Sequence, residues 1–225
     1  MTDIASNIRS INKQIPSSVK LVAVSKTKSA DDILEAYNSG QKRFGENRVR
    51  ELIQKKDLLP PDIEWHFIGH LQTNKVRLVV PAVSMIQSVD TFKLLKIIDA
   101  EASRIERIID CLLQIHIAGE ETKFGFSMTE LHEMLQSEDF RKLNSVSLCG
   151  VMGMATFTDD DQRIKSEFRY LYGCFEELRT KYFRESPVFK EISMGMSGDF
   201  RIAIEEGSTI IRIGSLIFGE RNKTN

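Results

Sequence analysis

A lysine follows the first strongly apolar segment of the chain. Residues 21–24 read Leu-Val-Ala-Val, a run typical of a buried strand, and Lys26 comes two residues later in the segment Ser-Lys-Thr-Lys. An ammonium group at the carboxyl end of a buried parallel strand is costly to desolvate, so it is either solvated on a loop or held there for chemistry. A partly desolvated lysine has a lowered pKa and attacks carbonyl carbons as the free amine. Lys26 is therefore a candidate for Schiff-base formation, with a solvated surface lysine as the alternative.

Two short segments near the C-terminal end of the chain are candidates for holding an anion. The segment SMGMSGDF places Gly195 and Gly198 around Ser197, directly before a predicted helix. A glycine-containing loop that leads into a helix presents backbone N–H groups, which favour an anion. The segment RIGS adds Gly214 and Ser215 at the end of the last predicted strand. Either loop alone reads as an ordinary tight turn, but their joint placement favours a phosphate-bearing ligand.

A ligand with both a phosphate and a carbonyl group would use the lysine and the loops together. Two ligand classes have this chemistry: pyridoxal 5′-phosphate, and the sugar phosphates of class I aldolases. Arg212 alternates with two isoleucines on the last predicted strand and therefore points to the opposite face from them. Its guanidinium needs a partner, which is either a cofactor ring nitrogen or an anion, or else Glu46 or Asp199 in a structural ion pair.

The histidines show no metal-binding pattern. His66 and His70 flank Phe-Ile-Gly, but no third His, Cys or carboxylate lies at ligand spacing, and no HExxH motif occurs. We therefore expect no metal site, and we expect His66 to be a core histidine or one that supports a functional residue.

Strand-length apolar runs alternate with helical patterns along the whole chain. Strands are predicted at 21–25, 43–45, 65–68, 85–88, 112–117, 148–152, 191–194 and 210–213, and helices at 30–38, 49–56, 91–107, 128–136, 162–182 and 199–205. This alternation predicts a parallel sheet, and eight strands in this length are what a closed (β/α)8 barrel (the TIM barrel) requires. A doubly wound open sheet is the alternative. We expect one domain over residues 1–225, with an amphipathic N-terminal helix within residues 1–18 packed on the barrel.

Composition excludes several classes of function. The 225 residues are 41% hydrophobic and 28% charged, with a net charge of −1, so nothing draws the chain broadly to nucleic acid or to an acidic membrane. No apolar run is long enough to span a bilayer, and the N-terminus does not resemble a secretory signal. Three dispersed cysteines without a CxxC motif fit a reduced, cytoplasmic protein.

Several long segments together resemble a known family. AVSKTK, FGENRVRE, WHFIGHLQTNK, GVMGMA and SMGMSGDFRIAIEEGSTIIRIGSLIFGER are similar to the pyridoxal 5′-phosphate homeostasis proteins, over nearly the whole chain. The resemblance implies a (β/α)8 barrel like the N-terminal domain of alanine racemase, with pyridoxal 5′-phosphate as the cofactor. One difference is Ser29, where the family often has proline; we expect it to change loop stiffness more than chemistry.

The resemblance also implies roles for individual residues. Lys26 matches the lysine that forms the aldimine with the cofactor, and Arg212 matches an arginine that faces the pyridine nitrogen. Asn47 is expected near the cofactor, and Lys123 falls where a second lysine approaches the site. The phosphate-binding groups are matched by Ser197, Gly214 and Ser215.

The family is regarded as binding the cofactor, and buffering or delivering it, without a confirmed enzymatic activity. Alanine racemase has a second, β-rich domain that supplies a catalytic tyrosine and the dimer contact, and we expect this chain to lack that domain. Its four tyrosines lie in predicted helices, away from the strand ends. We therefore expect a monomeric cofactor holder whose recipients are apo-enzymes that depend on pyridoxal phosphate, with an amino acid racemase or decarboxylase as the alternative.

Overall fold

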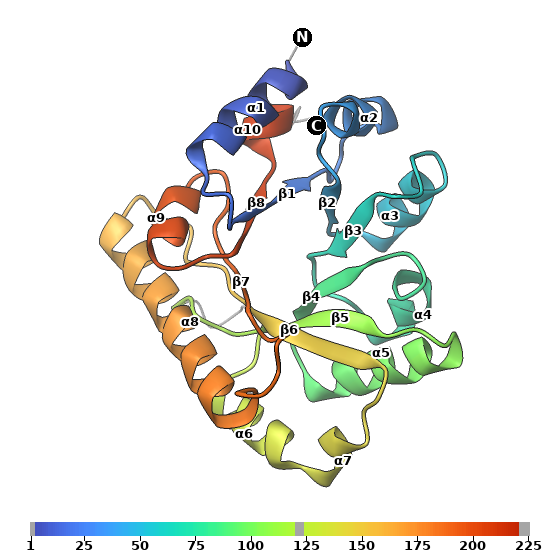
Figure 1. The fold of residues 1–225 in the computed structure, drawn as a ribbon, viewed down its shortest axis with the longest axis vertical. Helices are drawn as coiled ribbons and strands as arrows, with labels where there is room; N and C mark the ends of the chain where they lie inside the picture. Colours follow the sequence, from blue (N-terminus) through green and yellow to red (C-terminus); the bar gives the residue numbers. More distant parts are fainter. Residues whose placement is uncertain (1–2, 120–123, 221–225) are drawn as a thin grey trace.

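The computed structural model describes residues 3–119 and 124–220. Within them, eight parallel strands close into a barrel in the order β1-β2-β3-β4-β5-β6-β7-β8, with the helices around it (Figure 1). The predicted (β/α)8 barrel is confirmed, and the open doubly wound sheet is excluded because β1 pairs with β8. The strands are β1 (Lys20–Val24), β2 (Arg43–Glu46), β3 (Glu64–Phe67), β4 (Met85–Val89), β5 (Ile109–Gln114), β6 (Val146–Met152), β7 (Glu191–Ser193) and β8 (Ile210–Ile213).

Most strand predictions agree with the structure to within two residues, but the fifth was wrong by three. The sequence pattern predicts a strand over 112–117, whereas β5 begins at Ile109 and ends at Gln114. Beyond that point Ile115 forms an isolated bridge with Phe126, and the His116 N–H donates to the Phe126 carbonyl. The chain therefore stays extended after β5 but pairs with its own loop.

Polar side chains set the beginnings of several helices. Ser29 accepts a hydrogen bond from the Asp32 N–H and donates its own N–H to the Asp32 carboxylate, which forms a capping box. Proline could not donate the second of these bonds, so Ser29 contributes more than loop stiffness. The α-helices are α1 (Ile4–Gln14), α2 (Ala30–Asn38), α3 (Val49–Lys56), α4 (Val76–Val79), α5 (Phe92–Arg104), α6 (Met128–Gln136), α7 (Glu138–Arg141), α8 (Asp161–Tyr182), α9 (Phe200–Glu205) and α10 (Ser215–Phe218).

The core has two parts because side chains alternate across each strand. A large apolar layer lies between the strands and the helices, and it includes Phe44, Phe67 and Phe168. A smaller cluster of Val22, Met85, Leu112, Cys149, Met152 and Ile210 forms a separate set of buried residues. Interior side chains of this kind make the barrel of such folds a packed core rather than a pore.

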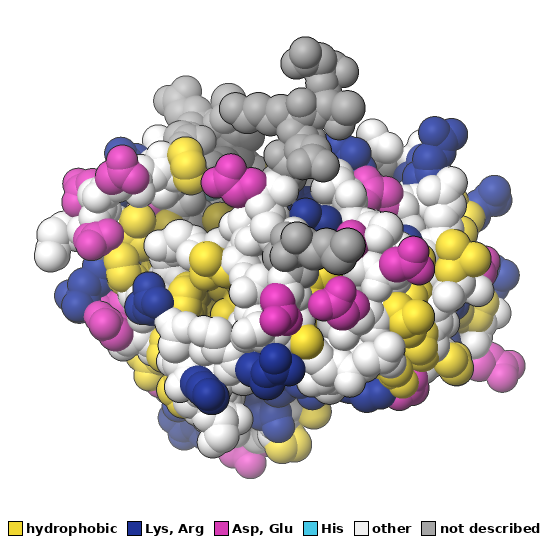
Figure 2. All heavy atoms as spheres, turned by 90° about the horizontal axis from the view of Figure 1, so that it is seen from above, with side chains coloured by type: hydrophobic (Ala, Val, Ile, Leu, Met, Phe, Trp, Pro, Cys, Tyr) yellow, Lys and Arg dark blue, Asp and Glu magenta, His cyan; other side chains and the backbone are white. Residues whose placement is uncertain are grey.

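The N-terminal helix packs through one face. Ile4, Ile8 and Ile11 of α1 are buried, and α1 contacts both α2 and α10 (Figure 1). In the described part of the chain, no helix combines the length and the apolar composition that crossing a membrane would need. On the face shown in Figure 2, basic and acidic side chains are interspersed, as the small net charge predicts.

Candidate functional site

A cavity of about 730 Å³ opens at the carboxyl ends of the strands. This is the end of a (β/α)8 barrel where active sites lie. All six residues that the sequence proposed for ligand binding line this cavity, namely Lys26, Asn47, Ser197, Arg212, Gly214 and Ser215. The seventh candidate, Lys123, lies outside the described residues.

The loop that carries Lys26 is held on both sides of the lysine. Strand alternation places Lys26 on the same side as Val24, and both line the cavity. Thr27 has a positive φ of 65°, and its N–H donates to Glu51 Oε2 at 2.6 Å. Lys28 Nζ donates to the Phe218 carbonyl at 2.8 Å, which ties the loop to α10. A constrained backbone on either side limits where the Lys26 amine can lie.

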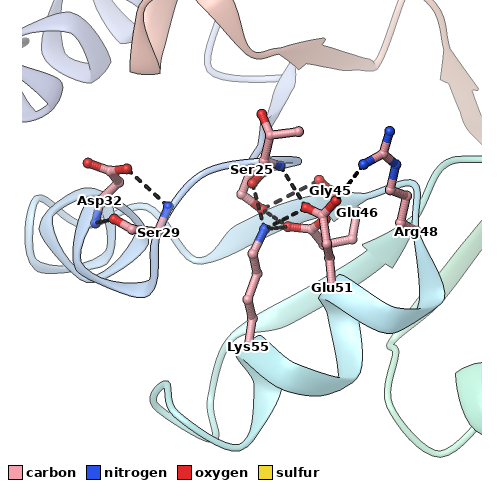
Figure 3. A network of polar contacts seen from close by, with 9 residues as sticks. Ser25, Ser29, Asp32, Gly45, Glu46, Arg48, Glu51 and Lys55 are labelled. Atoms are coloured by element: carbon pink, nitrogen blue, oxygen red, sulfur yellow. Dashed lines mark hydrogen bonds and ion pairs between the residues drawn. The ribbon is translucent and has the colours of Figure 1, made fainter. Parts of the chain in front are cut away.

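A buried ion pair lies behind the same loop (Figure 3). Lys55 Nζ donates to Glu46 Oε1 at 2.7 Å and to the Ser25 carbonyl at 2.8 Å, and Ser25 Oγ donates to the same Glu46 oxygen at 2.7 Å. Burial raises the pKa of Glu46, and the bonds from Lys55 and Ser25 oppose that rise. Glu46 therefore pairs with Lys55, and the sequence-based suggestion of a Glu46–Arg212 pair was wrong, because Glu46 points away from the barrel interior toward α3.

The two candidate anion loops contact each other. The Gly214 N–H donates to Ser197 Oγ at 3.3 Å, so the loops after β7 and β8 meet at one wall of the cavity. Gly195 has a φ of +94°, and a Cβ there would lie 2.6 Å from the Ala203 Cβ. Only glycine fits this close turn into α9. The wall thus gathers hydroxyl and backbone N–H donors, the groups that hold a phosphate.

Arg212 is buried in the wall of the cavity. Its Nη1 donates to Ser193 Oγ at 2.6 Å, and its Nη2 donates to the Gly153 carbonyl at 2.9 Å. Burial lowers the pKa of Arg212 to about 10, opposed by the negative charge of Asp199, so the guanidinium stays charged at neutral pH. Asp199 itself accepts the Met196 N–H. The hydrogen bonds of Arg212 thus go to neutral oxygens, and its charge remains available to a ligand.

Sequence reasoning missed the residues that support Arg212 and several that line the cavity. Ser193 and Gly153 lie within the segments SMGMSGDF and GVMGMA, but no role was assigned to either; strand alternation with Glu191 is the signal that places Ser193 inside the barrel. The further cavity residues include Lys28, Gln114 and Thr156. Within the described ranges, no group of three His, Cys, Asp or Glu side chains is arranged to hold a metal ion.

The donor set fits a cofactor with an aldehyde, a phosphate and a ring nitrogen. Lys26 supplies an amine, the Ser197 and Ser215 hydroxyls supply phosphate donors, and Arg212 supplies a fixed cation. Asn47 Oδ1 is buried without a hydrogen-bond partner, so the wall also holds an open acceptor. Pyridoxal 5′-phosphate matches this combination of groups.

Comparison with known proteins agrees with this assignment. Residues 1–222 match the family described as alanine racemase, N-terminal domain. The chain is 41% identical to the pyridoxal phosphate homeostasis protein of Aquifex aeolicus over 203 residues, which are 90% of this chain and 87% of that protein. It is 41% identical to the Homo sapiens protein of the same name over 214 residues, which are 90% and 77% of the two chains.

Solved structures show the same fold. PipY of Synechococcus elongatus with PLP bound is 35% identical, with a TM-score of 0.87 over 96% of this chain and 100% of that chain. Alanine racemase of Clostridium difficile is 12% identical, with a TM-score of 0.75 over 99% of this chain and 57% of that chain, and shares the fold alone. Fold and site thus define a barrel of the alanine racemase N-terminal domain type. The chain belongs to the family of pyridoxal phosphate homeostasis proteins.

Proposed function

We propose that this chain binds pyridoxal 5′-phosphate in the barrel-mouth cavity and acts in its homeostasis. One observation carries the proposal: six residues from four strand ends, chosen from the sequence for this chemistry, line a single cavity. PipY, a structural relative with PLP bound, and the names of the curated relatives support the same ligand.

Each group in the cavity has a proposed part in binding. The Lys26 amine would hold the ligand by condensing with its aldehyde carbon, with loss of one water, to give a Schiff base. The Ser197 and Ser215 hydroxyls would hold the phosphate at the loop that Gly214 forms, and Arg212 would face the ring nitrogen. An arginine at that position would keep the nitrogen unprotonated and weaken the ring as an electron sink.

The positions of the tyrosines favour holding over catalysis. Tyr37 lies on α2, and the other three, Tyr170, Tyr172 and Tyr182, lie on α8. Of the described residues that line the cavity, none is a tyrosine. A racemase needs an acid and a base on opposite faces of the substrate carbon; a lysine freed from the Schiff base would supply one of them, and no described tyrosine lines the cavity to supply the other.

We further propose that the chain acts as a single-domain monomer in the cytoplasm and passes the cofactor to apo-enzymes that require it. All six proposed binding residues come from one chain, so binding needs no second copy. Cys111, Cys149 and Cys174 are buried free thiols, which suits a reducing compartment. Light scattering tests the monomer, and reactivation of a pyridoxal-phosphate-dependent apo-enzyme by the loaded protein tests delivery.

The experiment for the binding site is a visible absorption spectrum of the purified protein, followed by borohydride reduction and peptide mass mapping. Wild type is expected to show a visible band and a reduced adduct on Lys26, and Lys26→Ala to lose both. Lys56→Ala, at a partly exposed lysine on α3 that does not line the cavity, is the matched control and is expected to keep both. A wild type that takes up no added pyridoxal 5′-phosphate overturns the function, and an adduct on Lys28 overturns the assignment of Lys26.

A further inference from the structure

A chain of hydrogen bonds crosses the barrel interior behind Arg212. Arg212 Nη1 lies 2.6 Å from Ser193 Oγ, and Ser193 Oγ lies 2.7 Å from Gln87 Oε1. Gln87 Nε2 lies 2.8 Å from His66 Nδ1. The four side chains come from β8, β7, β4 and β3, and all are buried. The chain therefore links the guanidinium at the cavity wall to the opposite side of the barrel.

The placement of the Gln87 amide gives the chain a direction. A guanidinium only donates, so Ser193 Oγ accepts from Arg212, and its hydroxyl donates to Gln87 Oε1. The Gln87 amide nitrogen faces His66, so His66 Nδ1 accepts in this arrangement. A neutral His66 with its proton on Nε2 fits the arrangement.

The burial of His66 agrees with that neutral state. Desolvation first, and then the positive charges of Arg43 and Lys20, lower the pKa of His66 to about 3. A protonated His66 would turn an N–H toward the Gln87 amide group and break the chain. The neutral imidazole is thus the state in which all four side chains are satisfied.

We propose that Ser193, Gln87 and His66 are positioning residues that fix the Arg212 guanidinium toward the ring nitrogen of the bound cofactor. Two of the guanidinium nitrogens are held, one by this chain and one by the Gly153 carbonyl, so the plane of the group is set from behind. A planar, pre-oriented guanidinium loses less freedom when it binds than a mobile one. The inference rests on the proposed function, because the ring nitrogen belongs to pyridoxal 5′-phosphate.

The test measures how well the protein recognises the ring nitrogen. Dissociation constants are measured for pyridoxal 5′-phosphate and for its 1-deaza analogue, in which CH replaces the ring nitrogen. Wild type is expected to prefer the natural cofactor. Ser193→Ala and Gln87→Met are each expected to reduce that preference roughly three- to tenfold, the range that one ordinary hydrogen bond corresponds to. Ser193→Thr, which keeps the hydroxyl, is expected to retain the wild-type preference.

The matched control is Ser208→Ala. Ser208 is also a buried serine, but its hydroxyl bonds to backbone carbonyls of β7 and β8 and lies outside the chain. Ser208→Ala also removes a buried hydroxyl, so it reports the effect of a general loss of stability. Its preference for pyridoxal 5′-phosphate over the 1-deaza analogue should stay at the wild-type value. If Ser193→Ala keeps the same preference as Ser208→Ala, the positioning role is wrong.

A second measurement needs no substitution. The ¹⁵N spectrum of His66 in wild type is expected to show an unprotonated Nδ1 and a protonated Nε2. A proton on Nδ1 overturns the directed chain even if the variants do not fold. A wild type that binds neither ligand contradicts the proposed function instead, so the two failures are distinguishable.

Discussion

Lys55 Nζ lies 2.7 Å from Glu46 Oε1, and the two side chains are 11% and 0% exposed. The same ammonium contacts the Ser25 carbonyl, directly before Lys26. Helix α3 is thereby joined to the ends of β1 and β2 through a charge pair removed from water (Figure 3). The segment that presents the lysine to the cavity depends on this pair.

We expect Lys55→Met to lower the free energy of unfolding by about 3–5 kcal/mol at pH 7, because it leaves the Glu46 carboxylate buried and unpaired. The loss should shrink toward pH 5, since burial raises the pKa of Glu46 and protonation removes the uncompensated charge. Urea denaturation measures both. The control is Lys42→Met, whose partner Asp62 is exposed, and it should have a much smaller effect. Equal losses in the two variants would show that the buried pair has no special weight.

His66 gives a second prediction, about pH. Its pKa is about 3 in the folded protein, against the ordinary histidine value of 6.5 in an unfolded chain, so the unfolded chain binds the extra proton first as the pH falls. Folded wild type therefore loses stability below pH 6.5, by up to about 1.4 kcal/mol per pH unit from this group. Between pH 6.5 and 5, His66→Gln should lose roughly 2 kcal/mol less than wild type.

Denaturation curves at the two pH values measure the difference between the proteins. His132→Gln serves as the control, since that histidine lies between Tyr182 and Glu177, outside the barrel, and the variant retains His66. Between pH 6.5 and 5, the His132→Gln variant should lose the same amount of folding stability through His66 as wild type does. If His66→Gln loses as much stability as wild type over this range, the pKa of His66 is not lowered in the folded protein.

Alanine substitutions at two glycines, Gly195 and Gly40, distinguish the cost of backbone strain from the cost of a steric clash. Gly195 and Gly40 both have positive φ, +94° and +99°, but only at Gly195 would a Cβ meet a neighbour, the Ala203 Cβ at 2.6 Å. Gly40→Ala should cost about 1–2 kcal/mol for the left-handed backbone alone. Gly195→Ala should cost more and should also weaken phosphate-dependent binding, because its loop leads to Ser197. Equal losses of stability would mean that α9 moves aside freely.

The contact between Ser197 and Gly214 predicts where the phosphate is recognised. Ser197→Ala should weaken the binding of pyridoxal 5′-phosphate roughly tenfold, because a hydrogen bond to a charged group is lost. Pyridoxal, which lacks the phosphate, should bind the variant and wild type equally, and it serves as the internal control. Calorimetric titration measures both ligands. A parallel loss of pyridoxal affinity would place Ser197 elsewhere on the ligand.

The sequence determined the barrel and the location of the cavity. Eight apolar runs that alternate with amphipathic helices have one closed parallel solution, and parallel strands bring their carboxyl ends together. Lys26, Ser197 and Gly214 follow different strands, so their convergence was predictable from strand order alone. The fifth strand was placed three residues late because Ile115 and Ile117 continue the apolar pattern beyond Gln114, where β5 ends.

The tertiary structure alone decided which side chains pair with one another, both inside the barrel and between the barrel and its helices. Glu46 was assigned to Arg212 as one possibility, but the pleat turns it toward Lys55, and Arg212 bonds to Ser193 and Gly153. Ser193 and Gln87 are 106 residues apart, and no motif joins them. Local patterns fix the period of each element and therefore which side chains point inward. Which inward side chains touch depends on the closure of the barrel, because that alone sets the distance across it.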